Sequence, residues 1–193
     1  MPSDTAAPER RTVLLDEALR LLVDGGIGAI THRSVEKAAG VPHGSVTYWF
    51  ESRDGLLAAL VDRLVAECED VVGAISAPLA ATYAAGLQPD IAQLATAIAA
   101  WIDEHRAMHL ARLELELAAI RDPRLRARMH DAAAVFWRMC EPIAQALGSD
   151  DPRRDGRAMT AMLDGLLLDR LAHPPQGADV VEATLRRVLL APT

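Results

Sequence analysis

The sequence predicts an all-α fold of about nine helices. Helix-forming residues dominate, with 36 Ala and 26 Leu against 13 Val and 8 Ile, which excludes an all-β fold. Apolar residues recur at helical spacing, and Gly and Pro fall mainly between the periodic segments. With 193 residues, the chain can bury a hydrophobic core without disulfides or metal.

The first two helices are marked by their ends. A helix is predicted over residues 9–24, with Leu14, Ala18 and Leu22 on one apolar stripe, and the glycine pair at 25–26 ends it. Thr31 is a hydroxyl N-cap for a short second helix over 33–39.

A third short helix is predicted from Pro42 or His43 to Trp49. Ser52 then caps a long fourth helix from residue 53 to about residue 75, and Pro78 is expected to prevent its continuation. The remaining predicted helices span 91–104 with Asp90 as N-cap, 107–120, 123–147 with a kink at Pro142, 154–171 and 180–190.

Cysteine content and the apolar segments indicate a protein of the cytoplasm. Cys68 and Cys140 are too few for a disulfide framework or a zinc cluster, and the first residues contain no apolar leader. Residues 71–89 carry no charge, but their Pro, Gly and Ala content argues against a membrane span.

The net charge of −7 makes indiscriminate binding to nucleic acid improbable. Residues 10–53 nevertheless carry +1, so any contact with DNA must be local to this region.

Residues 31–50 have the spacing of a helix-turn-helix, because two helices too short to be stable alone flank the turn at residues 40–42. Val35, Val46 and Phe50 are expected to hold both helices on the first helix. The side chains left on the outer side of the second short helix are those of His43, Ser45, Thr47 and Tyr48, which suit base edges and phosphates.

This stretch resembles the TetR family of bacterial transcription regulators over residues 9–60. The family pattern T-x-x-x-I-A-x-x-A-G-V-S-x-G-x-x-Y-x-x-F-x-x-K-x-x-L is matched by Thr31, Val35, Ala39, Gly40, Val41, Gly44, Phe50, Arg53 and Leu56. Three residues depart from it: Glu36 replaces a usual alanine, Pro42 a capping serine, and Thr47 a usual tyrosine that the adjacent Tyr48 can replace.

The resemblance implies a homodimeric repressor that binds double-stranded operator DNA and is released by a small-molecule effector. It divides the chain into a DNA-binding domain at 1–52 and an effector-binding and dimerisation domain at 53–193. The residues expected to contact DNA are Arg10 and Arg11 on a basic arm, and Thr31, Arg33, His43, Gly44, Ser45, Thr47, Tyr48, Trp49 and Arg53.

The last two helices are expected to pair with those of a second copy in a four-helix bundle. Apolar residues surround most of the eighth helix, and small residues would permit a close approach. The expected interface consists of Ala158, Ala161, Met162, Gly165, Leu168, Val181, Leu185, Val188 and Leu189.

A mostly apolar effector pocket is predicted inside the C-terminal helices. Its candidate lining residues are Trp101, Met108, Arg112, Glu116, Phe136, Trp137, Cys140, Met162 and Asp164. The alternative is an ordinary core, with Arg112 and Glu116 as an exposed ion pair one helical turn apart.

No catalytic, metal or cofactor site is predicted. His105 and His109 are four residues apart but have no third ligand in a motif, so two surface or interface histidines are favoured. Two alternatives stay open. One is a helical effector-binding protein that no longer binds DNA, favoured by Glu36 and the small charge of residues 10–53, and the other is a small helical enzyme.

Overall fold

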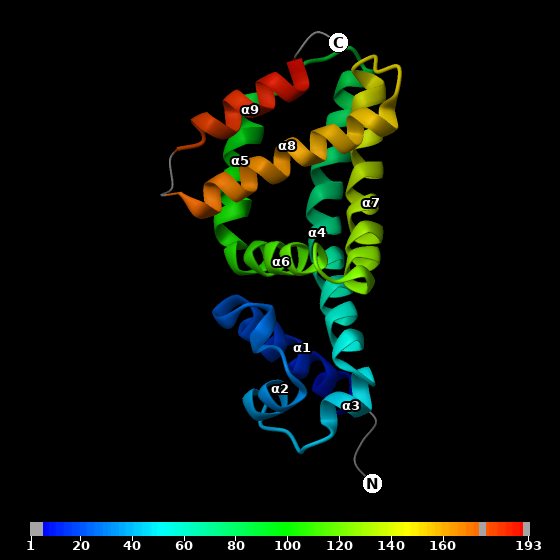
Figure 1. Cartoon of the computed structure of the whole chain (residues 1–193). Coiled ribbons are helices and arrows are strands. Elements are labelled where there is room, and N and C mark those ends of the chain that lie inside the picture. Colours follow the sequence, from blue (N-terminus) through cyan, green and yellow to red (C-terminus); the bar gives the residue numbers. More distant parts are fainter. Residues whose placement is uncertain (1–5, 174–176, 191–193) are drawn as a thin grey trace. The chain divides into compact units, whose positions relative to one another are not determined.

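The computed structural model describes residues 6–173 and 177–190, and this part of the chain is all-helical (Figure 1). The elements are α1 (Ala6–Gly25), η1 (Ile27–Ala29), α2 (His32–Ala38), α3 (Ser45–Phe50), α4 (Arg53–Ala84), α5 (Ile91–Glu104), α6 (Arg106–Ala119), α7 (Pro123–Ala146), α8 (Pro152–Ala172) and α9 (Asp179–Leu190). The predicted all-α fold of about nine helices is confirmed over residues 6–173 and 177–190.

The chain forms two compact units, which are described separately. The N-terminal unit contains residues 6–65 and 110–132, and the C-terminal unit contains residues 66–109, 133–173 and 177–190. Helices α4, α6 and α7 therefore contribute residues to both units. The assignment of separate functions to residues 1–52 and 53–193 stays a prediction.

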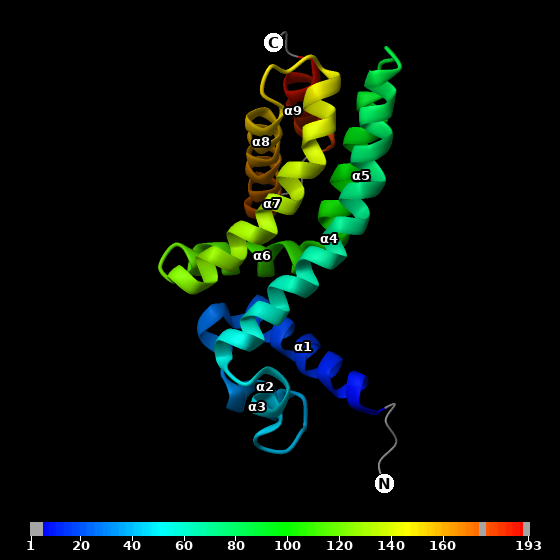
Figure 2. The ribbon, with the colours of Figure 1, turned by 90° about the vertical axis from the view of Figure 1, so that its right-hand side faces the viewer.

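In the N-terminal unit, α2 packs against α1 and α3, and the end of α3 contacts α1. Leu14, Leu22, Ile30, Val35 and Val46 are completely buried, as the helical spacing predicts. Helices α2 and α3 lie next to each other in Figures 1 and 2. Because each is too short to be stable alone, this shared core holds them in place.

The turn between α2 and α3 is longer than the sequence predicts. Gly40, with φ +63°, ends α2 as expected: its N–H donates to the Lys37 carbonyl, and the Val41 N–H donates to the Glu36 carbonyl. The prediction that α3 begins at Pro42 or His43 is wrong. Gly44 has φ +92°, which is left-handed backbone, so α3 begins only at Ser45.

Helix α4 contradicts the prediction that Pro78 ends it. The helix continues through the proline to Ala84, and Leu79 and Tyr83 beyond it are buried in the C-terminal core. Packing of these side chains offsets the loss of one backbone donor. Gly86, with φ +70°, is the actual end signal.

In the C-terminal unit, α9 packs on α5 and α8, as Figures 1 and 2 illustrate. Val181, Leu185 and Leu189 are almost completely buried there, and the Tyr83 hydroxyl donates to the Leu189 carbonyl. The chain's own core covers these three side chains, and their expected use at a dimer interface stays a prediction. Val188 is also partly buried against this core.

The other helix bounds agree with the predicted ones to within about one turn. Asp90 caps α5, because its carboxylate accepts the Gln93 N–H at 3.0 Å, and the Ser52 hydroxyl accepts the Gly55 N–H at the start of α4. In the described residues, no helix is long and apolar enough to cross a membrane.

Candidate nucleic-acid interface

The helix-turn-helix has an apolar underside and a polar outer side. Val35, Val46 and Phe50 face the core, with exposed fractions of 6% or less. On the outer side Tyr48 is 78% exposed, and its ring packs edge-on against Trp49 with 5.0 Å between the ring centroids. The helix therefore presents polar side chains outward while its other face is fixed.

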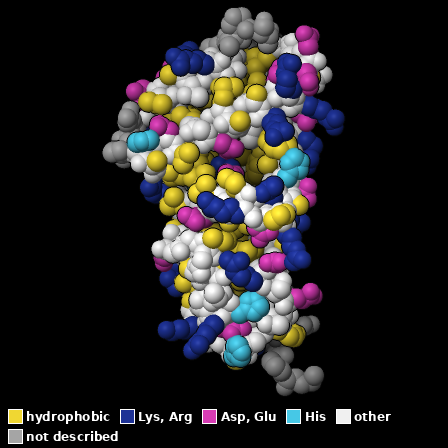
Figure 3. All heavy atoms as spheres, viewed as in Figure 1, with side chains coloured by type: hydrophobic (Ala, Val, Ile, Leu, Met, Phe, Trp, Pro, Cys, Tyr) yellow, Lys and Arg dark blue, Asp and Glu magenta, His cyan; other side chains and the backbone are white. Residues whose placement is uncertain are grey.

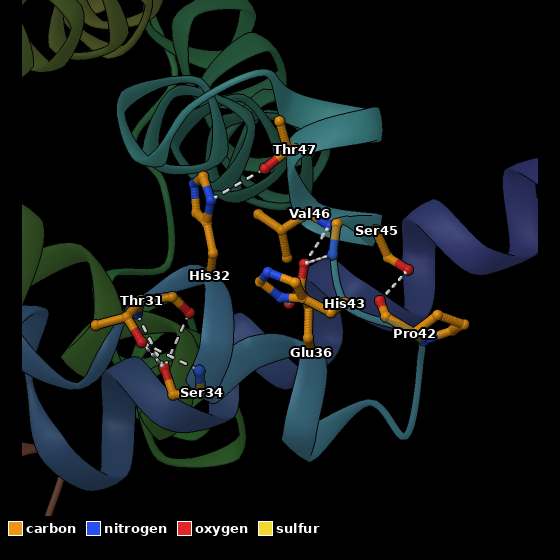
Figure 4. A network of polar contacts seen from close by, with 10 residues as sticks. Thr31, His32, Ser34, Glu36, Pro42, His43, Ser45, Val46 and Thr47 are labelled. Carbon is orange, nitrogen blue, oxygen red and sulfur yellow. Dashed lines mark hydrogen bonds and ion pairs between the residues drawn. The ribbon is translucent and has the colours of Figure 1, made fainter.

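All the residues predicted to contact DNA lie in the N-terminal unit. Seven are exposed: Arg10, Arg11, Thr31, Arg33, His43, Thr47 and Tyr48. Gly44, Ser45, Trp49 and Arg53 are partly buried. The Ser45 hydroxyl donates to the Pro42 carbonyl at 2.6 Å and so also stabilises the turn (Figure 4).

Arg10 and Arg11 are the two residues expected on a basic arm, and their contact with DNA stays a prediction. Both lie inside α1, which begins at Ala6 because the helix-forming residues continue toward the N-terminus. The Arg11 guanidinium carbon lies 5.3 Å from the centroid of the Phe50 ring. This cation–π contact links α1 to the end of α3.

Arg53 is a structural residue as well as a candidate contact. Its guanidinium donates to the backbone carbonyls of Ile30, at 2.7 Å, and Ile27, at 2.8 Å. The first turn of α4 is thereby tied to the segment before α2.

Thr31 caps α2 as the sequence predicts, and it does so through a reciprocal pair of hydrogen bonds. The Thr31 hydroxyl accepts the Ser34 N–H at 3.0 Å, and the Ser34 hydroxyl accepts the Thr31 N–H at 2.9 Å. This capping box, visible in Figure 4, fixes where α2 starts.

Glu36 has a role that the sequence reasoning missed. The residue is only 4% exposed, and its Oε1 accepts the N–H groups of Gly44, at 2.9 Å, and Val46, at 3.1 Å. Its Oε2 lies 2.9 Å from Nδ1 of His43 (Figure 4). Burial raises the pKa of Glu36, but the hydrogen bonds from Val46, His43 and Gly44 outweigh it, so the pKa lies below the ordinary glutamate value.

His32 is a second residue that the sequence reasoning missed. Its Nδ1 lies 3.2 Å from the Thr47 hydroxyl, which joins the first residue of α2 to the middle of α3. The sequence carried one signal for Glu36, because this residue stands where the family pattern has an alanine. No comparable pattern identified His32.

Basic side chains surround an open hollow of about 410 Å³ on the helix-turn-helix. Arg33, Lys37 and His43 line it together with Val41 and Glu36. Figure 3 shows Arg or Lys and His side chains gathered in the region of α2, with few acidic ones between them. The local charge is suited to the phosphates of a nucleic acid.

The predicted effector-pocket residues are divided between the two units. Arg112 and Glu116 belong to the N-terminal unit and form an ion pair of 2.6 Å, which is partly buried and not exposed as the alternative expected. The other predicted pocket residues belong to the C-terminal unit: Trp101, Met108, Phe136, Trp137, Cys140, Met162 and Asp164.

Within the C-terminal unit, the surroundings of five of these residues are described, and their role in lining a pocket stays a prediction. Met162 points outward from α8 with 45% of its surface exposed. The guanidinium carbon of Arg157 lies 4.5 Å from the centroid of the Trp137 ring and covers that ring. Met108 and Cys140 are buried, and burial raises the pKa of the Cys140 thiol. Trp101 has a buried indole nitrogen without a hydrogen-bond partner among the described residues.

The expectation that His105 and His109 lie at a surface or interface is half correct. His105 is exposed, but His109 is 1% exposed and packs edge-on against Trp101 at 4.5 Å. Among the residues that the structure describes, no three His, Cys, Asp or Glu side chains are grouped to hold a metal ion.

Two family models match this chain. Residues 14–60 match the model of bacterial regulatory proteins of the tetR family, and residues 89–191 match the tetracyclin repressor-like C-terminal domain. The first match contains the helix-turn-helix with its buried underside and its exposed outer side. Both models describe regulators, which confirms the expectation that the chain is not an enzyme.

Similar proteins match this chain over almost its whole length. A TetR family member from Streptomyces coelicolor is 30% identical, with a TM-score of 0.73 over 94% of this chain and 99% of the other. The multidrug-binding protein EbrR, solved with ethidium, is 30% identical, with a TM-score of 0.69 over 94% and 98%. The transcriptional regulator BetI 2 of Chromohalobacter salexigens is 27% identical over 95% of this chain and 87% of its own length. The chain therefore belongs to the tetR family and is a helix-turn-helix transcriptional regulator that binds DNA.

Proposed function

We propose that the chain represses transcription as a homodimer whose two α3 helices bind operator DNA, and that a small molecule bound in the C-terminal unit releases it. Such a regulator acts on chromosomal DNA and works in the cytoplasm. The outer side of α3 carries the proposal, because Thr47 and Tyr48 are exposed while Val46 and Phe50 fix the opposite side.

The DNA contacts fall into two groups. Thr47 and Tyr48 on α3, with His43 and Ser45 beside it, are positioned for base edges and nearby phosphates. Arg33 on α2, Thr31 and Arg10 are exposed and suit the phosphate backbone. The side chains on and beside α3 are supported by the turn and by contacts with the core. The supporting residues are Gly44, Trp49, Arg11 and Arg53.

A homodimer is supported by an exposed apolar face on α8. Ala158, Ala161, Met162, Gly165 and Leu168 are exposed and recur three or four residues apart, so they share one side of the helix. A second copy of this face can pack closely because three of the five residues are Ala or Gly. The α9 side chains are not needed for this interface.

An effector site is supported by the aromatic content of the C-terminal unit and by a similar protein that binds ethidium. The buried indole N–H of Trp101, which has no hydrogen-bond partner among the described residues, is the polar group that a ligand would use. The probe is ethidium, titrated without DNA because ethidium also binds duplexes. We expect saturable quenching of tryptophan fluorescence that persists in Trp49→Phe and weakens in Trp101→Phe. Equal quenching of the two variants would contradict this site.

The experiment that tests the main proposal is selection of genomic fragments by the purified protein, followed by gel retardation of the enriched duplex. We expect a sequence with two-fold symmetry and half-sites about one DNA turn apart. Enrichment of no sequence would support the alternative of an effector-binding protein that no longer binds DNA. That alternative has lost one of its arguments, because the Glu36 carboxylate is buried and does not present its charge to DNA.

A further inference from the structure

Helix α3 cannot fix its own starting point. It has six residues, and its N-cap is Gly44, which has no side chain to accept a hydrogen bond from the first turn. A helix this short leaves most of its backbone N–H groups without partners inside the helix. A group that accepts them therefore helps to set where α3 begins.

Glu36 is that group, and it lies on the preceding helix. Its backbone carbonyl accepts the Val41 N–H at 3.1 Å and so closes α2. Its side-chain Oε1 accepts the N–H groups of Gly44 and Val46 and so opens α3. One residue thus controls both ends of the turn that separates the two helices.

The second carboxylate oxygen of Glu36 contacts the exposed side chain of His43. Oε2 lies 2.9 Å from Nδ1 of His43, and the His43 side chain is 91% exposed. The contact restricts the ring while leaving its other edge toward solvent. His43 lines the same basic hollow as Arg33 and Lys37, where DNA phosphates are expected.

We propose that Glu36 is a positioning residue for DNA recognition, whose buried carboxylate sets the start of α3 and aims the His43 ring at the duplex. This inference rests on the proposed role of α3 as the recognition helix. A carboxylate in a DNA-binding unit is usually expected to repel phosphate. Here its position at the N-terminal end of α3 stabilises the helix, and its removal is expected to weaken binding.

The direction in which DNA affinity changes when the Glu36 carboxylate is removed distinguishes a positioning role from simple repulsion of phosphate. The variants are Glu36→Ala, which removes all three contacts, and Glu36→Gln, which keeps the shape and an acceptor but loses the charge. Glu51→Gln is the control, because it removes the same charge from an exposed residue at the other end of α3. Simple repulsion predicts tighter DNA binding for all three variants.

The positioning role instead predicts weaker binding only for the Glu36 variants. We expect a loss of about ten- to a hundredfold for Glu36→Ala, because the Gly44 and Val46 N–H groups lose their acceptor, and a smaller loss for Glu36→Gln. Glu51→Gln is expected to bind at least as tightly as the unmodified protein. Affinity is measured by fluorescence anisotropy on the duplex that the unmodified protein enriches from a random-sequence pool.

Two further measurements exclude a general loss of folding. Amide hydrogen exchange of the Glu36→Gln protein should accelerate at Gly44 and Val46 while the buried α1 amides keep their protection. In a double-mutant cycle on DNA affinity, Glu36→Gln and His43→Ala should be non-additive, because the carboxylate acts partly through the ring. Unchanged or tighter binding by the folded Glu36 variants would overturn the inference. Failure of the unmodified protein to enrich any duplex would instead overturn the proposed function.

Discussion

The Arg53 guanidinium donates from Nε to the backbone carbonyl of Ile30 at 2.7 Å, so the first residue of α4 holds the segment that precedes α2. Ile30 is completely buried, and a second bond from Nη2 reaches the carbonyl of Ile27. Arg53 therefore supports the DNA-binding surface from behind, whether or not it also touches a phosphate.

Arg53→Ala is expected to lower the free energy of unfolding by about 1–3 kcal/mol, because a charged donor to two backbone carbonyls is lost. Urea denaturation measures this change. Arg33→Ala is the matched control, since Arg33 is exposed on α2 and its loss should leave stability unchanged. The Arg33→Ala variant should instead lower the slope of log DNA affinity against log salt concentration by about one, as expected for the loss of one phosphate contact. Equal stability of both variants would contradict the structural role of Arg53.

Tyr48→Ala is expected to weaken operator binding by roughly ten- to a hundredfold, the usual range for a direct contact. Tyr48 is 78% exposed, so the melting temperature should not change. Tyr48→Phe separates the contribution of the hydroxyl from that of the ring. Titration of both variants against the selected duplex at several salt concentrations gives the affinity and the salt slope. An affinity equal to that of the unmodified protein would remove Tyr48 from the interface.

The proposed dimer is tested by placing a charge on the exposed face of α8. Leu168→Glu should convert the dimer to a monomer, because two carboxylates would meet across the two-fold axis without partners. Leu117→Glu is the control: Leu117 is 55% exposed and Leu168 is 52% exposed, and both lie on helices. Light scattering at micromolar concentration should detect a monomer for Leu168→Glu only. A dimer for both variants would move the interface elsewhere.

The sequence predicted the helices well where local signals decide them. Thr31 and Asp90 were recognised as caps and Gly40 as an end signal, because capping depends on the residue itself and its near neighbours. The prediction failed at Pro78, where packing of Leu79 and Tyr83 outweighs the local effect of proline. Burial of distant partners cannot be read from the segment alone.

The candidate site was predicted in outline but not in its supporting contacts. The exposure of Thr47 and Tyr48 followed from the spacing of Val46 and Phe50. Glu36 was misinterpreted because charge was counted without its location, whereas the carboxylate is buried and accepts two N–H groups. The α9 stripe was assigned to a partner because an apolar face does not reveal whether its own chain or a second copy covers it.

The lowered pKa of Glu36 predicts how the N-terminal unit responds to acid. A group whose pKa is lower in the folded state contributes stability above its unfolded pKa, about 4.3 for an ordinary glutamate, and this contribution is lost as pH falls through the folded pKa. Glu36→Gln has no such ionisation. The difference in unfolding free energy between the unmodified protein and Glu36→Gln should therefore be constant near neutral pH and shrink in the acid range.

The contribution of His43 is separated from this effect by mutation, because its ring contacts the same carboxylate. Arg33 and Lys37 line the same hollow. Urea denaturation of four proteins across pH provides the test: the unmodified protein, Glu36→Gln, His43→Ala and the double variant. In the His43→Ala background the stability difference made by Glu36 should be smaller but should still decline only in the acid range, since the Gly44 and Val46 N–H groups remain. A difference that stays constant into the acid range would show that the ionised carboxylate does not stabilise the start of α3.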